Sequence, residues 1–389
     1  MLRDFEQKVR NLKSQHLHRQ LQTVESPADA TITIQGRKLI SMASNNYLGL
    51  ANHPALKQAA IDAIQQWGVG AGAARLISGT MPPHNQLEND LAQFKQVEAA
   101  LTFGTGYTTN IGLIPTLIEQ DGLILTDRYC HASLIEASRL AKAKVRVFHH
   151  NDIEHLEKLL KKREKVSATL VVTEGVFSMD GDLAPLPDLL KLCQTYDATL
   201  VVDDAHGTGV MGANGRGTIE YFGLDPKDII QIGTLSKAIG TSGGYVAGTA
   251  SLINYLINVS KAFIFTTAQP PAIAAATSAA IEIIKNEPIC RHRLWENRDF
   301  LYSELKNMGF QLTNTQSPIL PIIVKSPEKA LQMSQALYKA GIYIPAIRPP
   351  TVPKESSRLR ITVSSGHSKE QLQYVIEIIK SSGEELLLI

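Results

Sequence analysis

Hydrophobic and polar positions repeat with two different periods along this chain, and the two periods alternate through most of its length. Short apolar runs rich in valine and isoleucine, ended by glycine or polar residues, predict buried β-strands. Such runs lie at residues 99–103, 123–126, 145–148, 169–173, 200–203, 229–232 and 245–247. Between most of them, apolar residues at helical spacing predict amphipathic helices. This alternation predicts an α/β fold whose sheet is largely parallel and covered by helices on both faces.

The flanking segments predict further elements. Helical spacing extends through residues 1–22 until Pro27 ends it, residues 31–34 and 38–43 predict a strand pair, and helices are predicted at 54–67 and 82–95. Helices are also predicted at 270–286, 289–308, 328–339 and 369–379, with strands at 319–324, 341–344 and 359–363. We therefore expect an N-terminal helix and strand segment at 1–50, a large domain at 51–285 and a small C-terminal α/β domain at 286–389.

Composition and charge exclude several classes of function. The chain has 44% hydrophobic and 20% charged residues, as is typical of a globular enzyme. A formal net charge of +2 gives no support for a nucleic-acid partner or an anionic membrane surface. Cys130, Cys193 and Cys290 are odd in number and widely spaced, so no disulfide framework is predicted. With no signal-peptide core and no apolar run of membrane-spanning length, we expect a cytoplasmic protein.

Lys237 carries the first chemical signal. It follows the predicted strand at 229–232, and Thr234 and Ser236 place two hydroxyl groups beside it. Burial in such a pocket lowers the pKa of a lysine and frees its amine to act as a nucleophile. Taken alone, the pattern fits a solvated lysine after a strand better.

Asp203 changes this interpretation. A fully apolar strand delivers Asp203 to the carboxyl edge of the sheet one βα unit upstream of Lys237, with His206 close behind. Ligands bind at this edge of parallel sheets. Pyridoxal phosphate requires a lysine that forms a Schiff base and a carboxylate that keeps the ring nitrogen protonated. The two residues together predict this cofactor.

Phosphate binding is predicted between the strand ending at Phe103 and the helix beginning near Thr108. The turn there contains Gly106 and Tyr107, and the free amides at the start of the helix would face an anion. Thr234 could add a hydroxyl donor. Without the nearby lysine, a plain strand–helix turn would be the preferred interpretation.

Three more residues are candidates for contact with the cofactor. His131 follows a strand at the start of a helix, where its ring could stack on the cofactor or simply cap the helix. Ser178 and His206 could bond the phenolic oxygen of the cofactor or support the Asp203 site, and their structural alternatives are turn formation and packing.

Other histidines and glycines are not assigned to the chemistry. His149 and His150 are interpreted as strand-end residues, and because no histidine, cysteine or carboxylate set has ligand spacing, no metal is predicted. The glycines at 207, 209 and 212 match a dinucleotide-binding fingerprint, but a turn-rich loop follows instead of a helix. This argues against a nicotinamide-linked oxidoreductase.

Arginines of the C-terminal region are candidates for substrate recognition. Residues 357–362 also predict a strand, and Arg358 and Arg360 share one face of it; an arginine can clamp a carboxylate with two parallel hydrogen bonds. A solvated arginine pair is the alternative, more plausible for Arg358 than for Arg360. Prolines at 349, 350 and 353 stiffen the loop that holds Arg348 and Thr351, which suits recognition of a second, longer substrate.

With these residues in hand, the sequence resembles the α-oxoamine synthases, pyridoxal-phosphate enzymes of fold type I. The resemblance extends from Leu17 through Arg360. The matching motifs are SNNYLG at 44–49, EGVFSMDG at 174–181, VDDAHGTG at 202–209 and SK at 236–237. It implies a large, mostly parallel seven-stranded sheet domain with a smaller C-terminal α/β domain, and a homodimer.

The resemblance also implies a role for each candidate residue. Lys237 would be the Schiff-base lysine and general base, Asp203 would pair with the pyridine nitrogen and His131 would stack on the ring. Ser178 and His206 would lie near the ring oxygen, and the phosphate would meet Thr234 and the amides of Gly106 and Tyr107. Arg360 and Asn45 would hold the amino-acid carboxylate, and Arg19 and Thr351 would meet the acyl substrate.

The implied reaction is a decarboxylative condensation of an amino acid with an acyl thioester. Residues 347–353 favour the branch that uses L-alanine and pimeloyl-CoA or pimeloyl-acyl-carrier protein. A glycine-using α-oxoamine synthase, a pyridoxal-phosphate aminotransferase and, more distantly, a non-catalytic scaffold remain alternatives. Ala71, Ala73 and Ala74 stand where many relatives carry serine or glycine, so hydroxyl contacts from that loop are not expected.

Overall fold

A seven-stranded sheet forms the centre of the computed structural model, which describes residues 4–14 and 18–389. Its strand order is β3-β9-β8-β7-β6-β4-β5, and β9 is antiparallel to both neighbours while the other pairs are parallel. The strands are β3 (Ala99–Phe103), β4 (Leu123–Asp127), β5 (Lys144–Phe148), β6 (Thr169–Glu174), β7 (Thr199–Asp203), β8 (Ile230–Thr234) and β9 (Gly244–Gly248). The mostly parallel seven-stranded sheet expected from the sequence is confirmed.

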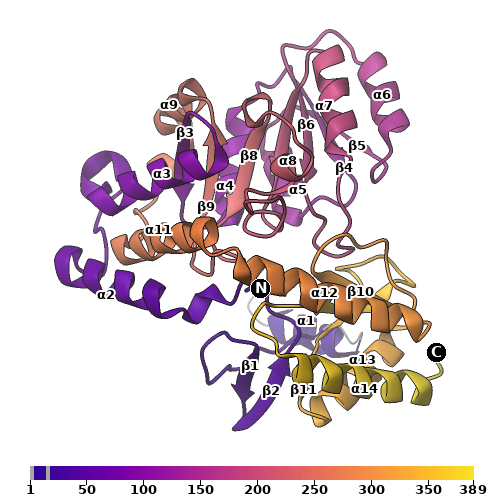
Figure 1. Ribbon diagram of the computed structural model, residues 1–389. Coiled ribbons are helices and arrows are strands. Elements are labelled where there is room, and N and C mark those ends of the chain that lie inside the picture. Colours follow the sequence, from indigo (N-terminus) through magenta and orange to yellow (C-terminus); the bar gives the residue numbers. More distant parts are fainter. Residues whose placement is uncertain (1–3, 15–17) are drawn as a thin grey trace.

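Helices cover both faces of this sheet, because its strands are apolar on both sides (Figure 1). Val172 packs among residues of the helices on one face, whereas its neighbour Val171 packs against helices on the other. The first face carries α4 (Gly106–Leu113), α5 (Ala132–Leu140), α9 (Ala250–Val259) and α10 (Lys261–Ile264). The second carries α3 (Pro82–Lys95), α6 (Ile153–Lys161), α7 (Leu186–Thr195) and α8 (Thr218–Tyr221), with α11 (Pro271–Asn286) packed against α3 and α2 (Pro54–Trp67) packed against α11.

The C-terminal part forms a smaller antiparallel sheet in the order β10-β13-β12. It contains α12 (Ile289–Asn307), β10 (Ile319–Lys325), α13 (Pro327–Lys339), β11 (Ile342–Tyr343), β12 (Ala346–Ile347), β13 (Ser357–Thr362) and α14 (Lys369–Glu385). The N-terminal hairpin of β1 (Thr31–Ile34) and β2 (Arg37–Ser41) forms a separate three-stranded sheet with β11, in the order β1-β2-β11, in which β2 pairs in parallel with β11. The two ends of the chain thus share a sheet, and the division at residues 50 and 285 stays a prediction.

Some predicted boundaries are wrong. The helix expected over 1–22 is α1 (Asp4–Ser14), and residues 18–22 are not helical; residues 1–3 and 15–17, with Leu17, lie outside the described residues. The strand expected at 341–344 shrinks to two residues because it pairs only with the end of β2. A π-helical turn at Arg75–Gly79 was not predicted.

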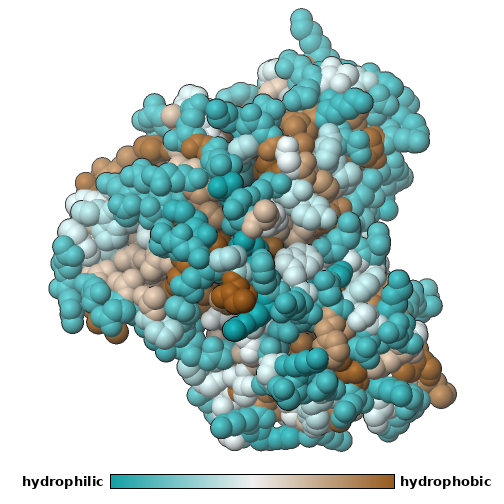
Figure 2. Space-filling model, in the orientation of Figure 1, coloured by the Kyte–Doolittle hydropathy of each residue, from teal (hydrophilic) through white to brown (hydrophobic). Residues whose placement is uncertain are grey.

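The outer surface is mostly hydrophilic on the face drawn in Figure 2, with small hydrophobic patches between the charged side chains. This face is indented between the part that carries the seven-stranded sheet and the part that carries α13 and α14. Within residues 4–14 and 18–389, no helix combines the length and apolarity needed to cross a bilayer. The cytoplasmic location expected from the sequence stays a prediction.

Candidate active site

A cavity of about 270 Å³ lies where β6, β7 and β8 end. Its lining consists of Thr105, Gly106, Tyr107, Asn110, His131, Ser133, Glu174, Asp203, Ala205, His206, Gly233, Thr234, Ser236 and Lys237. The structure therefore brings together the residues that the sequence predicted around a cofactor, with the exception of Ser178, which is not part of this lining. These residues meet because most of them follow parallel strands, and neighbouring parallel strands have their carboxyl ends at the same edge of the sheet.

Lys237 sits in a tight turn between β8 and β9. The N–H of Leu235 donates to the carbonyl of Gly243 (3.0 Å), which closes the turn, and Gly240 adopts a φ of +80° against the backbone of Ala51. Burial lowers the pKa of Lys237, although the negative charges of Asp203 and Glu174 act in the opposite direction. The site thus favours an amine that can lose its proton.

Asp203 is held by an asparagine that the sequence interpretation missed. Its Oδ2 accepts a hydrogen bond from Nδ2 of Asn110 (2.9 Å), and its Oδ1 accepts one from the N–H of Ala205 (3.1 Å). The Oδ1 atom of Asn110 is buried without a partner. The sequence did contain a signal for this contact. Asn110 lies one helical turn after the predicted phosphate-binding turn at Gly106, which places it in α4 near the same edge of the sheet.

Glu174 is a second carboxylate beside Asp203, because the two residues are paired across β6 and β7. Burial and the neighbouring charge of Asp203 raise the pKa of Glu174 to about 8, even though Lys237 and two backbone hydrogen bonds lower it. One of these bonds comes from the N–H of His131 (2.6 Å) and the other from the backbone of Ser178. The sequence interpretation gave Glu174 no role, although it ends a strand at the same edge.

Two neutral imidazoles border the cavity. His131 caps α5, and its Nδ1 lies 2.7 Å from Oγ of Ser133. Burial lowers the pKa of His131, and burial with the nearby charges of Lys237 and Arg360 holds that of His206 well below its usual range. Nδ1 of His206 lies 2.7 Å from Oη of Tyr47. Both rings are therefore available at neutral pH for stacking or hydrogen bonding without a charge.

The start of α4 comes unusually close to the turn after β8. A Cβ on Gly244 would lie 2.7 Å from Cα of Gly106 and 2.9 Å from its N atom, and a Cβ on Gly106 would lie 3.3 Å from the side chain of Thr234. The hydroxyls of Thr234 and Ser236 are 2.7 Å apart. Backbone amides at a helix start and two hydroxyls form a set of donors that suits a phosphate.

Arg360 approaches the cavity from β13 of the smaller sheet. Both Nη atoms lie 3.3 Å from Oδ1 of Asn45, and Nε donates to the carbonyl of Ser178 (2.6 Å). Asn45 in turn accepts a hydrogen bond from the hydroxyl of Tyr47 (3.4 Å), which also contacts His206. Arg360 and Asn45 are thereby connected to the wall of the cavity.

Arg358, two residues earlier, is not solvated. It is buried, and its Nη1 forms an ion pair with Asp180 (2.7 Å) and a hydrogen bond with the carbonyl of Met179 (3.1 Å). The alternative interpretation of a solvated arginine is wrong for this residue, because the loop after β6 folds over it.

The residues predicted to meet an acyl substrate fall into two groups. Nη2 of Arg19 donates to Oγ1 of Thr351 (3.2 Å), although 332 positions separate them. Thr351 also lines a cavity of about 310 Å³ together with Tyr129 and Phe177. Arg348 lies elsewhere, in a cavity of about 540 Å³ that residues 20–22 and α13 line.

Comparisons with known proteins agree with this geometry. A family model described as aminotransferase class I and II matches residues 37–379. The 8-amino-7-oxononanoate synthase of Alkaliphilus oremlandii (strain OhILAs) is 44% identical over 386 residues, which cover 99% of this chain and 98% of that protein. The 8-amino-7-oxononanoate synthase 1 of Bacillus subtilis (strain 168) is 42% identical, with 100% of both chains covered. The chain belongs to the α-oxoamine synthase family of pyridoxal-phosphate enzymes.

Solved structures show the same relationship. A serine palmitoyltransferase from S. paucimobilis, with pyridoxal phosphate and myriocin bound, superimposes with a TM-score of 0.94 at 32% identity, covering 99% of this chain and 98% of that one. The 8-amino-7-oxononanoate synthase of Francisella tularensis gives a TM-score of 0.77 at 29% identity, with 89% and 98% covered. The protein therefore has the fold of the fold type I pyridoxal-phosphate enzymes. It is a pyridoxal-phosphate-dependent acyltransferase.

The residues present fit the cofactor of the α-oxoamine synthases. The cavity combines a buried lysine, a carboxylate fixed by Asn110, two uncharged imidazoles and a cluster of phosphate donors. The glycine at 244 leaves room for the close approach of the donors, and a side chain there would fill it. This donor set matches the aldehyde, ring nitrogen, ring face and phosphate of pyridoxal phosphate.

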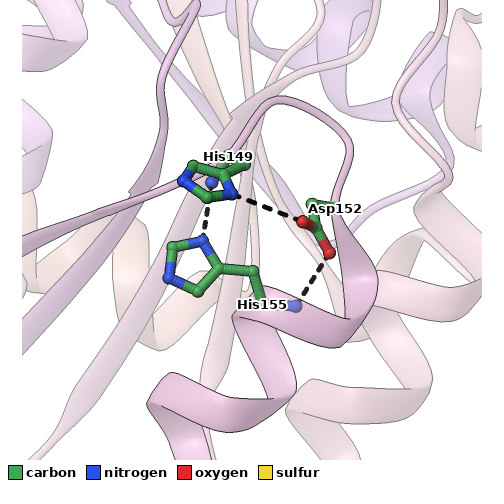
Figure 3. A group of neighbouring side chains, drawn as sticks. All are labelled: His149, Asp152 and His155. Atoms are coloured by element: carbon green, nitrogen blue, oxygen red, sulfur yellow. Dashed lines mark hydrogen bonds and ion pairs between the residues drawn. The ribbon is translucent and has the colours of Figure 1, made fainter.

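Within residues 4–14 and 18–389, one group of side chains outside the cavity is close enough to share a metal ion: His149, Asp152 and His155 (Figure 3). Its members already contact one another through Nδ1 of His149, Nδ1 of His155 and the carboxylate of Asp152. Asp152 caps α6 by accepting from the N–H of His155 (2.8 Å), and Nδ1 of His155 accepts from the N–H of His149 (3.1 Å). The cluster is accounted for as a helix cap, and we assign it no metal.

Proposed function

We propose that the protein condenses L-alanine with a pimeloyl thioester, releasing carbon dioxide and free thiol and forming 8-amino-7-oxononanoate for biotin biosynthesis. The names of relatives at 42–44% identity over almost the whole chain support this substrate pair. The observation that carries it is the approach of Arg360 and Asn45 to the cavity that holds Lys237. An arginine at this place can bind the carboxylate of a small amino acid.

The chain's residues would hold pyridoxal phosphate at four points. Lys237 would hold the aldehyde carbon, Asp203 the ring nitrogen, and His131 one ring face, while Ser178 and His206 would lie near the ring oxygen. Thr234 and the amides of Gly106 and Tyr107 would hold the phosphate. When bound, the cofactor supplies an electron-withdrawing ring that stabilises the negative charge left at Cα of the substrate.

Proton transfer in this proposal belongs to Lys237. Arg360 and Asn45 fix the carboxylate of alanine so that its Cα–H bond points toward Nζ of Lys237. The lowered pKa of Lys237 makes its amine a suitable base, and the side chain of Asp203 would pair with the ring nitrogen. His131 then donates a hydrogen bond to the thioester carbonyl as negative charge develops on its oxygen.

The acyl substrate would approach from the side of the loop at 348–353. The contact between Arg19 and Thr351 and the cavity of about 310 Å³ beside Thr351 support this route. We assign Arg348 to the outer part of the acyl-donor site, because it lies in a separate cavity. The thioester carrier in this proposal is either coenzyme A or an acyl-carrier protein.

The proposed enzyme is a homodimer. Val69, Leu76, Ile77 and Phe265 expose large apolar side chains, with Ile77 82% and Phe265 81% exposed. The two segments that carry them are joined by a bridge between Ala74 and Thr267, so the four residues belong to neighbouring surface. Burial of this surface against a second copy would remove it from water.

The test is a panel of thiol-release assays. Alanine, glycine and serine are each combined with pimeloyl, acetyl, succinyl and palmitoyl thioesters. We expect turnover with alanine and a pimeloyl thioester, and loss of both turnover and the cofactor's yellow absorbance in Lys237→Ala. Preference for glycine or serine, amino transfer to a keto acid without thiol release, or normal turnover in Lys237→Ala would each contradict the proposal.

A further inference from the structure

Outside the cavity, the partly buried His150 lies between two carboxylates. Its Nδ1 lies 3.0 Å from Oδ1 of Asp127 and its Nε2 lies 2.8 Å from Oδ2 of Asp182. The rings of Tyr129 and Phe177 lie against it, with centroids at 4.6 and 4.4 Å. A neutral imidazole would turn a lone pair toward one carboxylate, whereas an imidazolium donates to both. The geometry therefore fits the charged form, and the interpretation of His150 as a plain strand-end residue is wrong.

The three residues come from three successive loops at the carboxyl edge of the sheet. Asp127 ends β4 four residues before His131, and it accepts hydrogen bonds from the N–H groups of Tyr129 (2.7 Å) and Asn151 (2.9 Å). These bonds shape the turn that leads into His131. His150 itself follows the edge strand β5.

Asp182 lies four residues after Ser178, in the loop that follows β6. The N–H of Phe177 donates to the carbonyl of Asp182 (3.0 Å), so the loop that contains Ser178 is closed at Asp182. The carbonyl of Ser178 accepts from Arg360 (2.6 Å). The backbones of His131 and Ser178 also meet at Glu174, which accepts a hydrogen bond from each.

We propose that His150 is a positioning residue: as an imidazolium between Asp127 and Asp182, it fixes the turn that carries His131 and the loop that carries Ser178. It touches neither cofactor nor substrate. It acts on cofactor binding through His131 and on alanine binding through Ser178 and Arg360, and the second effect rests on the proposed function. The side chain of Asn151, which donates to Oδ2 of Asp182 (3.0 Å), supports the same link.

Electrostatics agree with this arrangement. Burial lowers the pKa of His150, but the hydrogen bonds and charges of Asp127 and Asp182 outweigh burial and raise the pKa to about 9. These two carboxylates are the charged groups that face the ring from β4 and from the loop after β6; Tyr129 and Phe177 contribute ring contacts. Breaking one side of a partly buried charged pair leaves the other charge without its partner, which is unfavourable.

The test uses His150→Gln and Asp182→Asn, with His149→Gln as the matched control because His149 is adjacent but exposed. Side-chain NMR of labelled histidine follows His150 directly. We expect His150 to be charged at pH 7.5 in the wild-type protein and to titrate near pH 9, and its pKa to fall in Asp182→Asn because one negative partner is lost. A neutral His150 at pH 7.5 in the wild-type protein would overturn the proposal.

Binding and kinetics test the positioning effect. In both variants we expect the dissociation constant of pyridoxal phosphate and the KM for alanine to rise by roughly tenfold, since small misplacements of positioned groups are costly. His149→Gln should leave both unchanged. A purely structural role would lower only the folded fraction and the apparent kcat, so unchanged dissociation constant and KM in folded variants would refute positioning. If the wild-type protein does not use alanine, the proposed function fails, and the NMR and cofactor measurements still decide this inference.

Discussion

At the scale of single residues, the site depends on paired groups whose partners suppress or favour a charge. Lys237 shares its buried surroundings with Asp203 and Glu174, and burial together with the charge of Asp203 raises the pKa of Glu174. When two carboxylates share a buried site, the pKa of one of them rises, so that the two do not carry full negative charges side by side. The same principle distinguishes Arg360, whose Nη atoms share one amide oxygen, from Arg358, which is committed to Asp180.

This difference gives a prediction for Arg360→Lys. Lysine keeps the charge but loses the planar fork that binds a carboxylate with two hydrogen bonds. We expect the KM for alanine to rise by ~10- to 100-fold, the range that corresponds to losing one charge-assisted hydrogen bond. Steady-state thiol release measures it, and the absorbance of the bound cofactor should not change.

Arg358→Lys is the matched control, because the residue lies on the same face of β13 but pairs with Asp180. Its alanine KM should equal that of the wild-type protein. Equal KM increases in both variants would show that the strand, and not the carboxylate contact of Arg360, is responsible.

At the scale of elements, the phosphate-binding set depends on how closely β9 packs against α4. Gly244 pairs with Thr234 of β8 and Phe103 of β3, so it lies in the interior of the sheet. Its missing side chain lets the first turn of α4 reach the sheet, and Thr109 of that helix also lies against it. The start of α4 at Gly106 is thereby brought next to the side chain of Thr234.

We accordingly expect Gly244→Ala to impair cofactor binding. The added Cβ would lie 2.7 Å from Cα of Gly106, which is backbone and must shift. Overpacking of this kind costs about 1–3 kcal/mol of stability, and the displaced helix start should weaken pyridoxal phosphate binding. Thermal unfolding and titration with the cofactor measure the two effects.

Gly248→Ala, at the other end of β9, serves as the control. Its Cβ would meet only a terminal carbon of the Leu252 side chain, at 3.1 Å, which can move aside. A Gly244→Ala variant that binds the cofactor as tightly as Gly248→Ala would refute the importance of this close approach.

At the scale of the whole molecule, both ends of the chain contribute to the proposed substrate region. The N-terminal hairpin pairs with β11, and the following segment carries Asn45 to Arg360. Arg19 likewise donates a hydrogen bond to Thr351, although the two residues are 332 positions apart in the sequence. The exposed apolar surface around Ile77 and Phe265 is the feature that the proposed dimer accounts for.

The dimer proposal predicts the effect of a charge at its centre. Ile77→Glu should shift the protein from the mass of two chains toward that of one in sedimentation, because a buried unpaired carboxylate is unfavourable. Leu140→Glu, at an exposed position in the last turn of α5, should leave the mass unchanged. A wild-type protein that sediments as a single chain at micromolar concentration would contradict the proposal.

The sequence by itself determined the local elements and the identity of the chemical groups. Strand-forming runs, the polar residues at their ends and the glycine turns are read from neighbouring positions, so the seven-stranded sheet and the positions of Lys237 and Asp203 at its edge could be predicted. Only the tertiary structure decided which distant groups meet. The register that sets Glu174 beside Asp203, the helix turn that brings Asn110 to Asp203, and the placement of His150 between Asp127 and Asp182 depend on packing between separate elements. Local hydrophobic periodicity carries no information about such pairs.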